Sequence, residues 1–441
     1  MASTRLTRTN TGTITNNKKF TISFWMKRSV ISAAQETVFG SYPSGTSNDY
    51  VYFPSGDQLG FFGSISGSQS VYLLTTRVFR DVSAWYHIVI AVDTTQGTAA
   101  DRVKIYVNGT QETAFDQSSY PAPNVEFRLA EASNVQEIGA INNGNHFDGL
   151  LTQFIFVDGT AYDASTFGST DSTSGEWKPN ANPTVSYGNN GFKLTFEDTS
   201  NLGDDTSGNT NDFTMSGTGT STLDNPSNAF ATLNPLLQSG VGTLTNGNLS
   251  HASSSGIKHC ASTLGMTTGK FYAEVKYTGG GNYNGVGIIT EDAFSTTSNW
   301  YSTTNGALLY YTDVYSGGNT YGTFATPSTG DIIGIALDLD NGYMYWSNNG
   351  VWGNSGVPTS GATGTGGIAT SLIGTLGSST FFFATEQDAT SGTRGADWNF
   401  GNGYFGTTAV TSAGTGASTP GTFEYNVPNG YQPLTTKGLN T

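Results

Sequence analysis

The feature that most constrains this chain is an alternation of apolar and polar residues that returns along much of its length. Residues 20–27 (FTISFWMK) place Phe20, Ile22 and Phe24 on one face of an extended backbone, with polar residues between them. Residues 86–92 repeat the pattern. A period of two predicts half-buried strands, whereas a helical face would repeat about every 3.6 residues. We therefore expect an all-β fold.

Asparagine-glycine pairs mark the turns between these strands. The pair at 108–109 follows the alternating residues 103–107, and the pair at 341–342 joins two apolar runs. Asparagine and glycine both tolerate the positive φ angles of two-residue hairpin turns. The pairs thus predict antiparallel hairpins, and we expect antiparallel β-sandwiches of the jelly-roll kind.

The length of the chain, 441 residues, exceeds what one hydrophobic core usually organises, so we expect two sandwich domains in tandem. Between residues 198 and 237 apolar residues thin out and Asp, Asn, Gly, Ser and Thr dominate, which is typical of a segment between domains. The predicted boundaries are a first sandwich at 1–215, an ordered bridge at 216–240, a second sandwich at 241–410, and a C-terminal loop and tail at 411–441 packed on the second sandwich.

Charge and cysteine content exclude several classes of protein. A formal net charge of -15 leaves no basic surface for a phosphate backbone, so we expect no nucleic-acid partner. Cys260 is the only cysteine, which excludes an intrachain disulfide and a cysteine-based zinc cluster. No apolar run approaches the length that spans a bilayer, and the polar start has no apolar signal core. We expect neither a membrane segment nor secretion by that route.

Four segments of the first half form a recognisable set. They are residues 20–27, residues 85–89 (WYHIV), residues 103–109 with their asparagine-glycine turn, and residues 149–156 (GLLTQFIF). Together they resemble the laminin-G and concanavalin-A-like sandwich family, over roughly the first 170 residues. The resemblance implies an antiparallel sandwich.

A late segment departs from the order of that family. Residues 192–196 (FKLTF) and the loop at 205–209 (DTSGN) resemble the opening strand and loop of such domains, yet they stand at the end. We predict that this late strand closes the first sandwich, as in a circular permutation.

The second half carries another set of motifs. Residues 330–338 (GDIIGIALD) precede an asparagine-glycine turn, residues 269–277 form an earlier strand, and residues 397–401 (DWNFG) a late one. These motifs resemble the SPRY, or B30.2, sandwich over about residues 240 to 405. A second β-sandwich is implied.

The pairing of the two modules, with residues 228–236 between them and residues 431–434 near the end, resembles structural proteins of tailed phages. The resemblance implies a protein made in the host cytoplasm and placed on the virion surface, as a head fibre, decoration or tail appendage. Its implied partners are other virion proteins, further copies of itself, with a trimer favoured, and a host-surface glycan or protein.

Catalytic motifs do not stand out in the sequence. The paired-carboxylate E-x-D-x-E pattern of concanavalin-like glucanases is missing, and Glu386 stands in a fragment near turn residues. His87 lies within a predicted strand, where an imidazole hydrogen-bonds within the sheet, and His146, His251 and His259 lie in loop-like sequence. We predict a non-catalytic protein without catalytic residues. The alternative is a carbohydrate-active or carbohydrate-binding protein of the concanavalin-like class.

Aromatic residues in and beside the predicted loops of the second domain are the candidate ligand-binding residues. Exposed aromatic rings on loops make contacts with sugars or proteins, although core packing accounts for most such residues. The candidates are Trp300, Tyr301, Tyr310, Tyr311, Tyr315 and Trp352.

An acidic loop late in the first domain is the candidate metal site. Carboxylate and amide oxygens are the ligands that calcium prefers, and a solvated acidic loop is the competing interpretation. The candidate ligands are Asp204, Asp205, Asn209 and Asp212. We expect no cofactor other than calcium.

Overall fold

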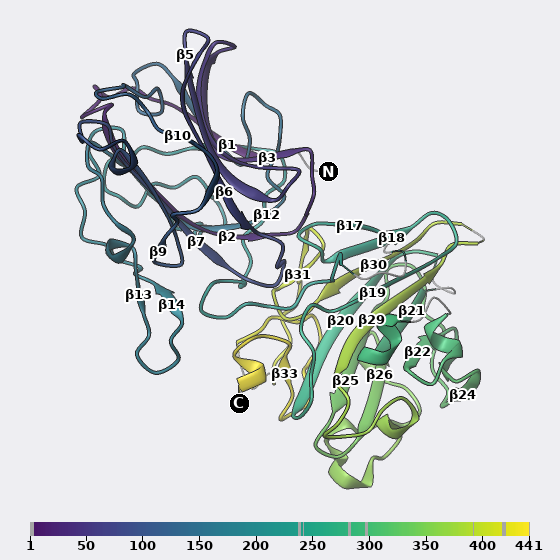
Figure 1. Ribbon diagram of the computed structural model, residues 1–441. Helices are drawn as coiled ribbons and strands as arrows, with labels where there is room; N and C mark the ends of the chain where they lie inside the picture. The colour runs from purple at the N-terminus through teal and green to yellow at the C-terminus, as the bar shows by residue number, and fades with distance from the viewer. Residues whose placement is uncertain are drawn as a thin grey trace. The chain divides into compact units, whose positions relative to one another are not determined.

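The computed structural model describes residues 4–236, 240, 242–280, 284–295, 299–390, 392–416 and 420–440. The chain divides into two compact units, Met1–Ser221 and Thr222–Thr441. Regular structure in the described ranges consists of strands and short 3-10 helices (Figure 1). The predicted all-β fold of antiparallel sheets is confirmed.

The boundary between the units falls inside the predicted bridge. Residues 216–221 belong to the first unit, and the described residues from 222 onward belong to the second. The bridge residues 237–239, and residue 241 beyond it, lie outside the described residues.

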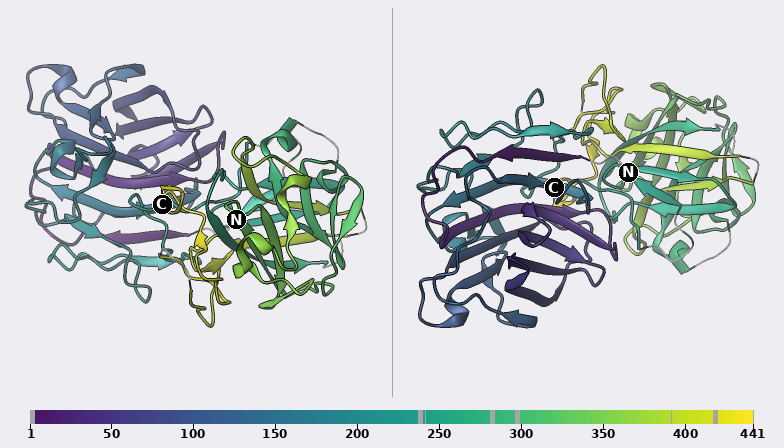
Figure 2. Two further views of the ribbon diagram at one scale, coloured as in Figure 1. Left: turned by 90° about the horizontal axis from the view of Figure 1, so that it is seen from below. Right: turned by 90° about the horizontal axis from the view of Figure 1, so that it is seen from above.

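The first unit contains two large sheets (Figures 1 and 2). The eight-stranded sheet has the order β10-β6-β5-β4-β3-β11-β1-β16. Its strands are β1 (Arg5–Thr9), β3 (Gln35–Ser44), β4 (Ser47–Pro54), β5 (Gln58–Ile65), β6 (Ser68–Val78), β10 (Phe115–Ser119), β11 (Val135–Ile138) and β16 (Thr214–Ser216).

The six-stranded sheet of the first unit has the order β15-β12-β2-β7-β8-β9. Its strands are β2 (Lys19–Arg28), β7 (Tyr86–Asp93), β8 (Val103–Val107), β9 (Thr110–Gln111), β12 (Gly149–Asp158) and β15 (Phe192–Leu194). A separate hairpin pairs β13 (Gly168–Thr170) with β14 (Trp177–Pro179).

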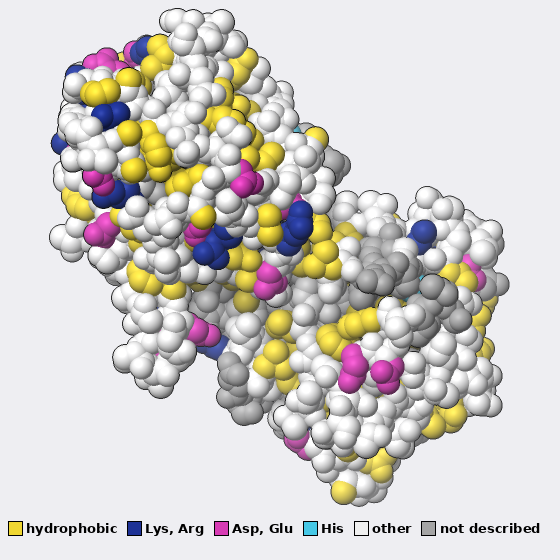
Figure 3. All heavy atoms as spheres, in the orientation of Figure 1, with side chains coloured by type: hydrophobic (Ala, Val, Ile, Leu, Met, Phe, Trp, Pro, Cys, Tyr) yellow, Lys and Arg dark blue, Asp and Glu magenta, His cyan; other side chains and the backbone are white. Residues whose placement is uncertain are grey.

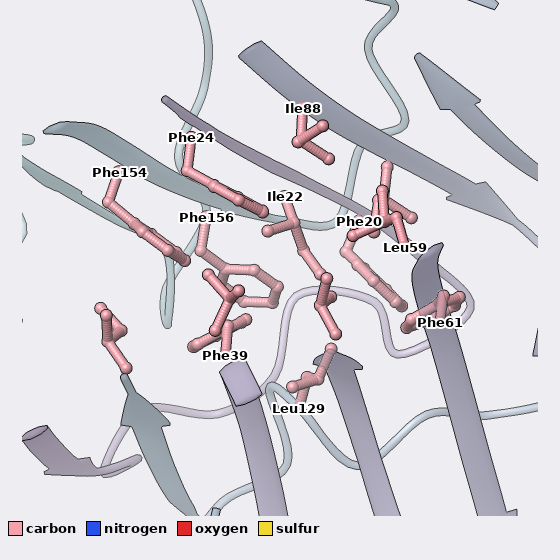
Figure 4. Close-up of a cluster of buried hydrophobic side chains, with 14 of the residues drawn as sticks. Phe20, Ile22, Phe24, Phe39, Leu59, Phe61, Ile88, Leu129, Phe154 and Phe156 are labelled. Carbon is pink, nitrogen blue, oxygen red and sulfur yellow. The ribbon is translucent and has the colours of Figure 1, made fainter. Parts of the chain in front are cut away.

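The core of the first unit lies between these sheets. The alternating side chains of β2 that the sequence places on one face are buried there, and the ring of Phe24 stacks on that of Phe154 at 5.2 Å between centroids. Phe39 and Phe61 enter the same cluster from the eight-stranded sheet (Figure 4). Burying each such ring stabilises the fold by about 1.5–3 kcal/mol.

The late strand of the first unit lies where the sequence predicts it. β15 pairs with β12 at the edge of the six-stranded sheet, with Phe156 opposite Phe192. The side chains of Phe192 and Leu194 are fully buried in the core. The segment therefore closes the first sandwich.

The second unit contains a nine-stranded and a six-stranded sheet. The nine-stranded sheet runs β17 (Thr243–Thr245), β18 (Ser250–Ser253), β30 (Arg394–Asn399), β20 (Lys270–Gly279), β25 (Ile332–Asp338), β26 (Tyr343–Asn348) and β27 (Val351–Trp352), with β28 (Ile368–Ala369) beside β26 and β33 (Gln432–Pro433) beside β20. The six-stranded sheet runs β19 (Ile257–Ala261), β29 (Phe381–Asp388), β21 (Asn284–Thr290), β22 (Gly306–Tyr310), β23 (Asp313–Ser316) and β24 (Asn319–Tyr321). A small hairpin pairs β31 (Tyr404–Phe405) with β32 (Thr408–Ala409).

The C-terminal segment packs on the outer face of the nine-stranded sheet. β33 pairs in parallel with β20, and Phe423, Val427 and Tyr431 form a buried cluster with Tyr272 and Tyr345. The opposite face of that sheet carries the core of the second unit, which includes Trp346 and Trp398.

The remaining elements are short 3-10 helices: η1 (Ala99–Asp101), η2 (Ala164–Thr166), η4 (Glu291–Ser295), η5 (Trp300–Ser302), η6 (Pro358–Thr363), η7 (Thr370–Leu372) and η8 (Gly438–Asn440). Within the ranges that the structure describes, no helix has both the length and the apolar character needed to cross a bilayer.

Candidate functional site

The predicted aromatic residues of the second unit gather on one face of its six-stranded sheet. The side chains of β29 alternate there: Phe381 and Phe383 enter the core between the sheets, whereas Phe382 and Ala384 point to the outer face. Trp300, Tyr301, Tyr310, Tyr311 and Tyr315 all pack with that outer face. Five of the six predicted residues thus form one group, although they come from η5, β22, β23 and the turn between these strands.

Three tyrosines form the centre of this group, which we call the tyrosine cluster: Tyr301, Tyr310 and Tyr315. Their ring centroids lie 5.2 Å (Tyr301 to Tyr310), 6.0 Å (Tyr301 to Tyr315) and 6.2 Å (Tyr310 to Tyr315) apart, with edge-to-face geometry. Asn299 Nδ2 donates a hydrogen bond to the hydroxyl of Tyr301 at 3.1 Å. The two-residue turn between β22 and β23 brings Tyr310 and Tyr315 onto the same face.

Burial separates these aromatic residues into two kinds. Tyr301, Tyr311 and Tyr315 are partly exposed, whereas Trp300 is 0% and Tyr310 5% exposed. The expectation that Trp300 and Tyr310 offer exposed rings is therefore wrong. Trp300 Nε1 donates to the carbonyl of Ala293 at 3.1 Å, so its polar edge is used inside the unit. Both residues form the base on which the exposed rings rest.

Glu386 lies fully buried beneath the tyrosine cluster. Its Oε1 accepts a hydrogen bond from the Tyr310 hydroxyl at 2.6 Å, and its Oε2 accepts one from the Trp300 amide at 2.5 Å. Oε2 also lies 2.7 Å from His259 Nε2. Burial and the neighbouring carboxylate raise the pKa of Tyr310 well above its ordinary value, so the phenol stays protonated. Both carboxylate oxygens of Glu386 are satisfied by protein donors.

The sequence does not reveal this buried pair. His259 and Glu386 face each other on the paired strands β19 and β29, and His251 lies on β18. The loop placement of His251 and His259, and the turn placement of Glu386, are therefore wrong. The available signal was weak: residues 381–384 (FFFA) precede Glu386 and extend an apolar strand toward it. The sequence alone does not distinguish a buried carboxylate that accepts hydrogen bonds from three groups from an ordinary acidic residue on the surface.

Trp352 lies apart from the tyrosine cluster. It belongs to β27 in the nine-stranded sheet, where its ring centroid is 6.4 Å from that of Tyr272 and 6.5 Å from that of Tyr345. It is partly buried against the cluster formed by the C-terminal segment. The structure therefore does not bring Trp352 together with the other predicted residues.

The predicted calcium loop is held by hydrogen bonds within the chain. Asp205 accepts from the amides of Lys193 at 2.8 Å, Ser207 at 2.9 Å and Asn211 at 2.8 Å. Asp212 Oδ1 accepts from the amide of Asp205 at 2.9 Å. These contacts fix the loop against β15.

The side-chain amide of Asn209 also forms hydrogen bonds within the first unit. Asn209 Nδ2 donates to the carbonyl groups of Gly188 at 2.7 Å and Gly191 at 2.9 Å. The described part of the chain contains no group of three or more His, Cys, Asp or Glu side chains able to hold a metal ion. Calcium binding by Asp204, Asp205, Asn209 and Asp212 stays a prediction.

In a serine-histidine contact of the first unit, the hydrogen bond runs in the wrong direction to activate the serine as a nucleophile. His87 Nε2 lies 2.9 Å from Ser23 Oγ on the neighbouring strand, and His87 Nδ1 lies 2.9 Å from Trp177 Nε1. Indole nitrogen can only donate, so Nδ1 accepts and the proton of the neutral imidazole sits on Nε2. His87 then donates to Ser23 and cannot remove its proton. Burial lowers the pKa of His87 to about 3, which keeps it neutral.

Comparison with family models bears on the first unit. Residues 2–161 match the Laminin_G_3 family model, described as the concanavalin A-like lectin/glucanases superfamily. The resemblance of the first domain to that family is confirmed over those residues. No curated protein matches the chain in sequence.

Solved structures with similarity to the chain include a SPRY domain and a putative carbohydrate binding protein. The SPRY domain of human HERC1 has 16% identity and a TM-score of 0.26, over 34% of this chain and 85% of that one. A putative carbohydrate binding protein from Bacteroides ovatus has 14% identity and a TM-score of 0.31, over 48% of this chain and 56% of that one. We take no function from these similarities.

Proposed function

We propose that this chain is a non-catalytic binding protein of the surface of a tailed-phage virion, which attaches to glycans through the tyrosine cluster of its second unit. The observation that carries the binding role is the pair of partly exposed rings, Tyr301 and Tyr315, resting on the buried Tyr310. Tyrosine combines an apolar ring with a hydroxyl, which suits the apolar faces and hydroxyl groups of sugars.

Binding without cleavage is favoured by the state of the polar groups at this face. The Glu386 carboxylate beneath the rings is 0% exposed and already accepts hydrogen bonds from protein donors on both oxygens. A glycosidase needs two carboxyl groups that flank the scissile bond, one of them free to donate a proton. A carboxylate in the position of Glu386 holds the site together and does not reach a sugar.

The virion location rests on the resemblance of the paired modules to tailed-phage structural proteins. Other virion proteins and further copies of the chain, as a trimer, are the proposed partners, and a host-surface glycan or protein is the proposed target. The net charge of -15 suits a surface protein that must stay clear of the packaged nucleic acid.

The binding role is tested by affinity electrophoresis of the full chain in gels that contain host-surface or algal polysaccharides. We expect retarded migration that is weakened in the Tyr301→Ala/Tyr315→Ala variant, while the matched variant Tyr343→Ala on the nine-stranded sheet migrates like the parent. Equal retardation of all three proteins would remove the tyrosine cluster from the proposal. Light scattering on the same samples measures the copy number, and detection of the chain in purified particles tests the location.

The second candidate is a carbohydrate-active enzyme, because the family that residues 2–161 match includes glucanases as well as lectins. The two candidate functions differ in whether the chain releases a product from the polysaccharide. An enzyme releases new reducing ends from the polysaccharides that retard it, whereas a binding protein leaves their number unchanged after prolonged incubation.

A further inference from the structure

The eight-stranded sheet of the first unit carries a set of aromatic side chains on the face opposite the core. Val51, Phe61 and Val71 point into the core, so their neighbours on β4, β5 and β6 point outward. These outward residues include Tyr50, Tyr52, Phe62 and Tyr72, which we call the outer aromatic face. Three of them, Tyr50, Phe62 and Tyr72, are partly exposed.

The rings of the outer aromatic face form a continuous row across three strands. Tyr50 pairs with Phe62 and Phe62 with Tyr72, with ring centroids 5.3 Å and 5.8 Å apart. The ring of Tyr52 lies 5.2 Å from that of Tyr50. Its hydroxyl donates to that of Tyr72 at 3.4 Å, which links the second rung of the sheet to the first.

A glycine makes room for this arrangement. Gly60 pairs with Tyr52, and a methyl group on Gly60 would lie 2.3 Å from a ring carbon of Tyr52. The absence of a side chain at Gly60 therefore lets the Tyr52 ring lie across β5. Figure 3 shows hydrophobic side chains gathered on the side of the first unit where β5, β6 and β10 lie.

The positions that share two rungs with these rings on β3, β4, β5, β6 and β10 are uncharged. One rung of the sheet runs from Gly40 through the row of rings to Ser119, and the next from Thr37 through Tyr52 to Gln117. Across β3, β4, β5, β6 and β10 the two rungs are Gly40, Tyr50, Phe62, Tyr72, Ser119 and Thr37, Tyr52, Gly60, Leu74, Gln117. Beyond Gly40 the first rung continues to Glu137 on β11, which forms an ion pair with Arg5 at 3.7 Å. In a chain with a net charge of -15, these ten positions carry no formal charge, and those among them that are not buried offer a surface that suits a neutral ligand.

The ionisation of the phenols agrees with this character. Burial raises the pKa values of Tyr50 and Tyr52 above the ordinary value of tyrosine, so the hydroxyl groups stay protonated and able to donate. The five strands that share the two rungs span roughly 19 Å at the usual spacing between strands. This length is that of an extended chain of sugars, not of a single sugar.

We propose that the outer aromatic face of the first unit is a second binding site, and that it takes a neutral, unbranched glycan chain laid across β4, β5 and β6. The apolar C–H faces of the sugars stack on the partly exposed rings. The hydroxyl groups of the sugars hydrogen-bond with the phenols, Ser119 and Gln117. An acidic polysaccharide is disfavoured, because the net charge of the chain repels it.

The test uses the full chain in which the tyrosine cluster of the second unit has been removed by Tyr301→Ala and Tyr315→Ala. Any glycan binding that remains then comes from another surface, so failure of this inference and failure of the proposed function are separate results. The probes are laminarin, xylan and dextran as neutral polysaccharides and alginate as an acidic one, each cast into a gel for affinity electrophoresis.

We expect at least one neutral polysaccharide to retard this chain and alginate not to. Adding Tyr50→Ala and Phe62→Ala should weaken the retardation about tenfold or more, since each ring contributes stacking contacts. Tyr106→Ala, on β8 in the other sheet of the same unit, is the matched control and should leave the retardation unchanged. Far-UV circular dichroism verifies that each variant is folded.

A milder variant keeps the test decisive if the alanine variant does not fold. Tyr72→Ser changes a partly exposed ring at the end of the row and should reduce retardation by the same neutral polysaccharide. The proposal is overturned if no neutral polysaccharide retards the chain, or if retardation survives in every variant of the outer aromatic face. It is also overturned if Tyr50→Ala and Phe62→Ala instead dissociate a dimer seen by light scattering, because a second copy would then cover the face.

Discussion

The backbone amide of Arg128 donates a hydrogen bond to Asp49 Oδ2 at 2.5 Å, while Asp49 Oδ1 has no hydrogen-bond partner among the described residues. Asp49 is fully buried near the start of β4, on the same face of the strand as the core residues Val51 and Phe53. Burial raises the pKa of this carboxyl from 3.8 to about 7, and the amides of Arg128 and Leu129 offset only part of the effect. The side chain is therefore protonated in the folded protein at mildly acidic pH.

This pKa predicts how Asp49 affects stability at different pH values. The folded-state pKa lies above the unfolded value, so the contribution of Asp49 is full below about pH 4 and is lost as the pH rises through 7. The loss is on the order of 3–4 kcal/mol. We expect Asp49→Asn, which cannot ionise, to gain stability relative to the parent as the pH rises from 4 to 8.

The measurement compares urea denaturation midpoints of the two proteins at each pH. The comparison at equal pH is needed because burial lowers the pKa values of His87 and His251 to about 3, which favours unfolding as the pH falls below 6.5. Those two residues are common to both proteins and cancel. A difference between variant and parent that does not change with pH would contradict the prediction.

Glu386 is predicted to be a structural acceptor, and two substitutions separate its charge from its hydrogen bonds. Glu386→Ala leaves the Trp300 amide and His259 without their acceptor, at about 1–3 kcal/mol for each buried group, and leaves the Tyr310 hydroxyl only the backbone carbonyl of residue 386 at 3.2 Å. Glu386→Gln keeps one oxygen for Trp300 and His259 and offers its amide to the Tyr310 hydroxyl. We expect a loss above about 3 kcal/mol for alanine and about 1 kcal/mol for glutamine. Equal losses in urea denaturation would show that the charge matters more than the hydrogen bonds.

The fold could be predicted where one face of a strand is apolar and the other polar. β2 shows the alternation because Phe20, Ile22 and Phe24 enter the core while Thr21 and Ser23 meet the neighbouring segments. β4 hides it, because the outward Tyr50 and Tyr52 are as aromatic as the inward Phe53. A period of two can be recognised only where the two faces of a strand differ in polarity. A sheet with aromatic residues on both faces shows no such difference.

Most of the aromatic residues of the candidate site could be predicted from the sequence, but not which of them are buried and which are exposed. The sequence places Trp300 and Tyr301 next to each other, and a turn conformation decides that one is buried while the other remains partly exposed. The buried partner of this site, Glu386, lies 86 positions along the chain from Trp300. Contacts over such a separation arise from sheet pairing, which local sequence patterns do not encode.

Arg28 carries a buried charge network whose removal should be costly. Its Nη2 lies 2.6 Å from Glu36 and its Nη1 3.0 Å from Asp57, and all three side chains are at most 3% exposed. Arg28→Ala would leave Glu36 buried without its cationic partner and Asp57 paired with Arg80 alone, so we expect a loss of about 3–5 kcal/mol at neutral pH. Arg28→Lys keeps the charge but loses the planar fork that reaches both acids, and should fall between alanine and the parent in urea denaturation. If Arg28→Lys were as stable as the parent in urea denaturation, the bidentate geometry of the guanidinium group would contribute nothing to stability.

Gly168 and Trp177 should be energetically coupled. A methyl group on Gly168 would lie 2.6 Å from the indole ring of Trp177, whose Nε1 donates to His87. Gly168→Ala therefore displaces the indole and leaves His87 Nδ1 without its donor, at a cost of about 2–3 kcal/mol. In the Trp177→Ala background the ring is gone, and the same substitution should cost less than about 0.5 kcal/mol. A double-mutant cycle from four urea denaturation curves measures the difference, and a coupling energy near zero would mean that β13 relaxes away from the ring.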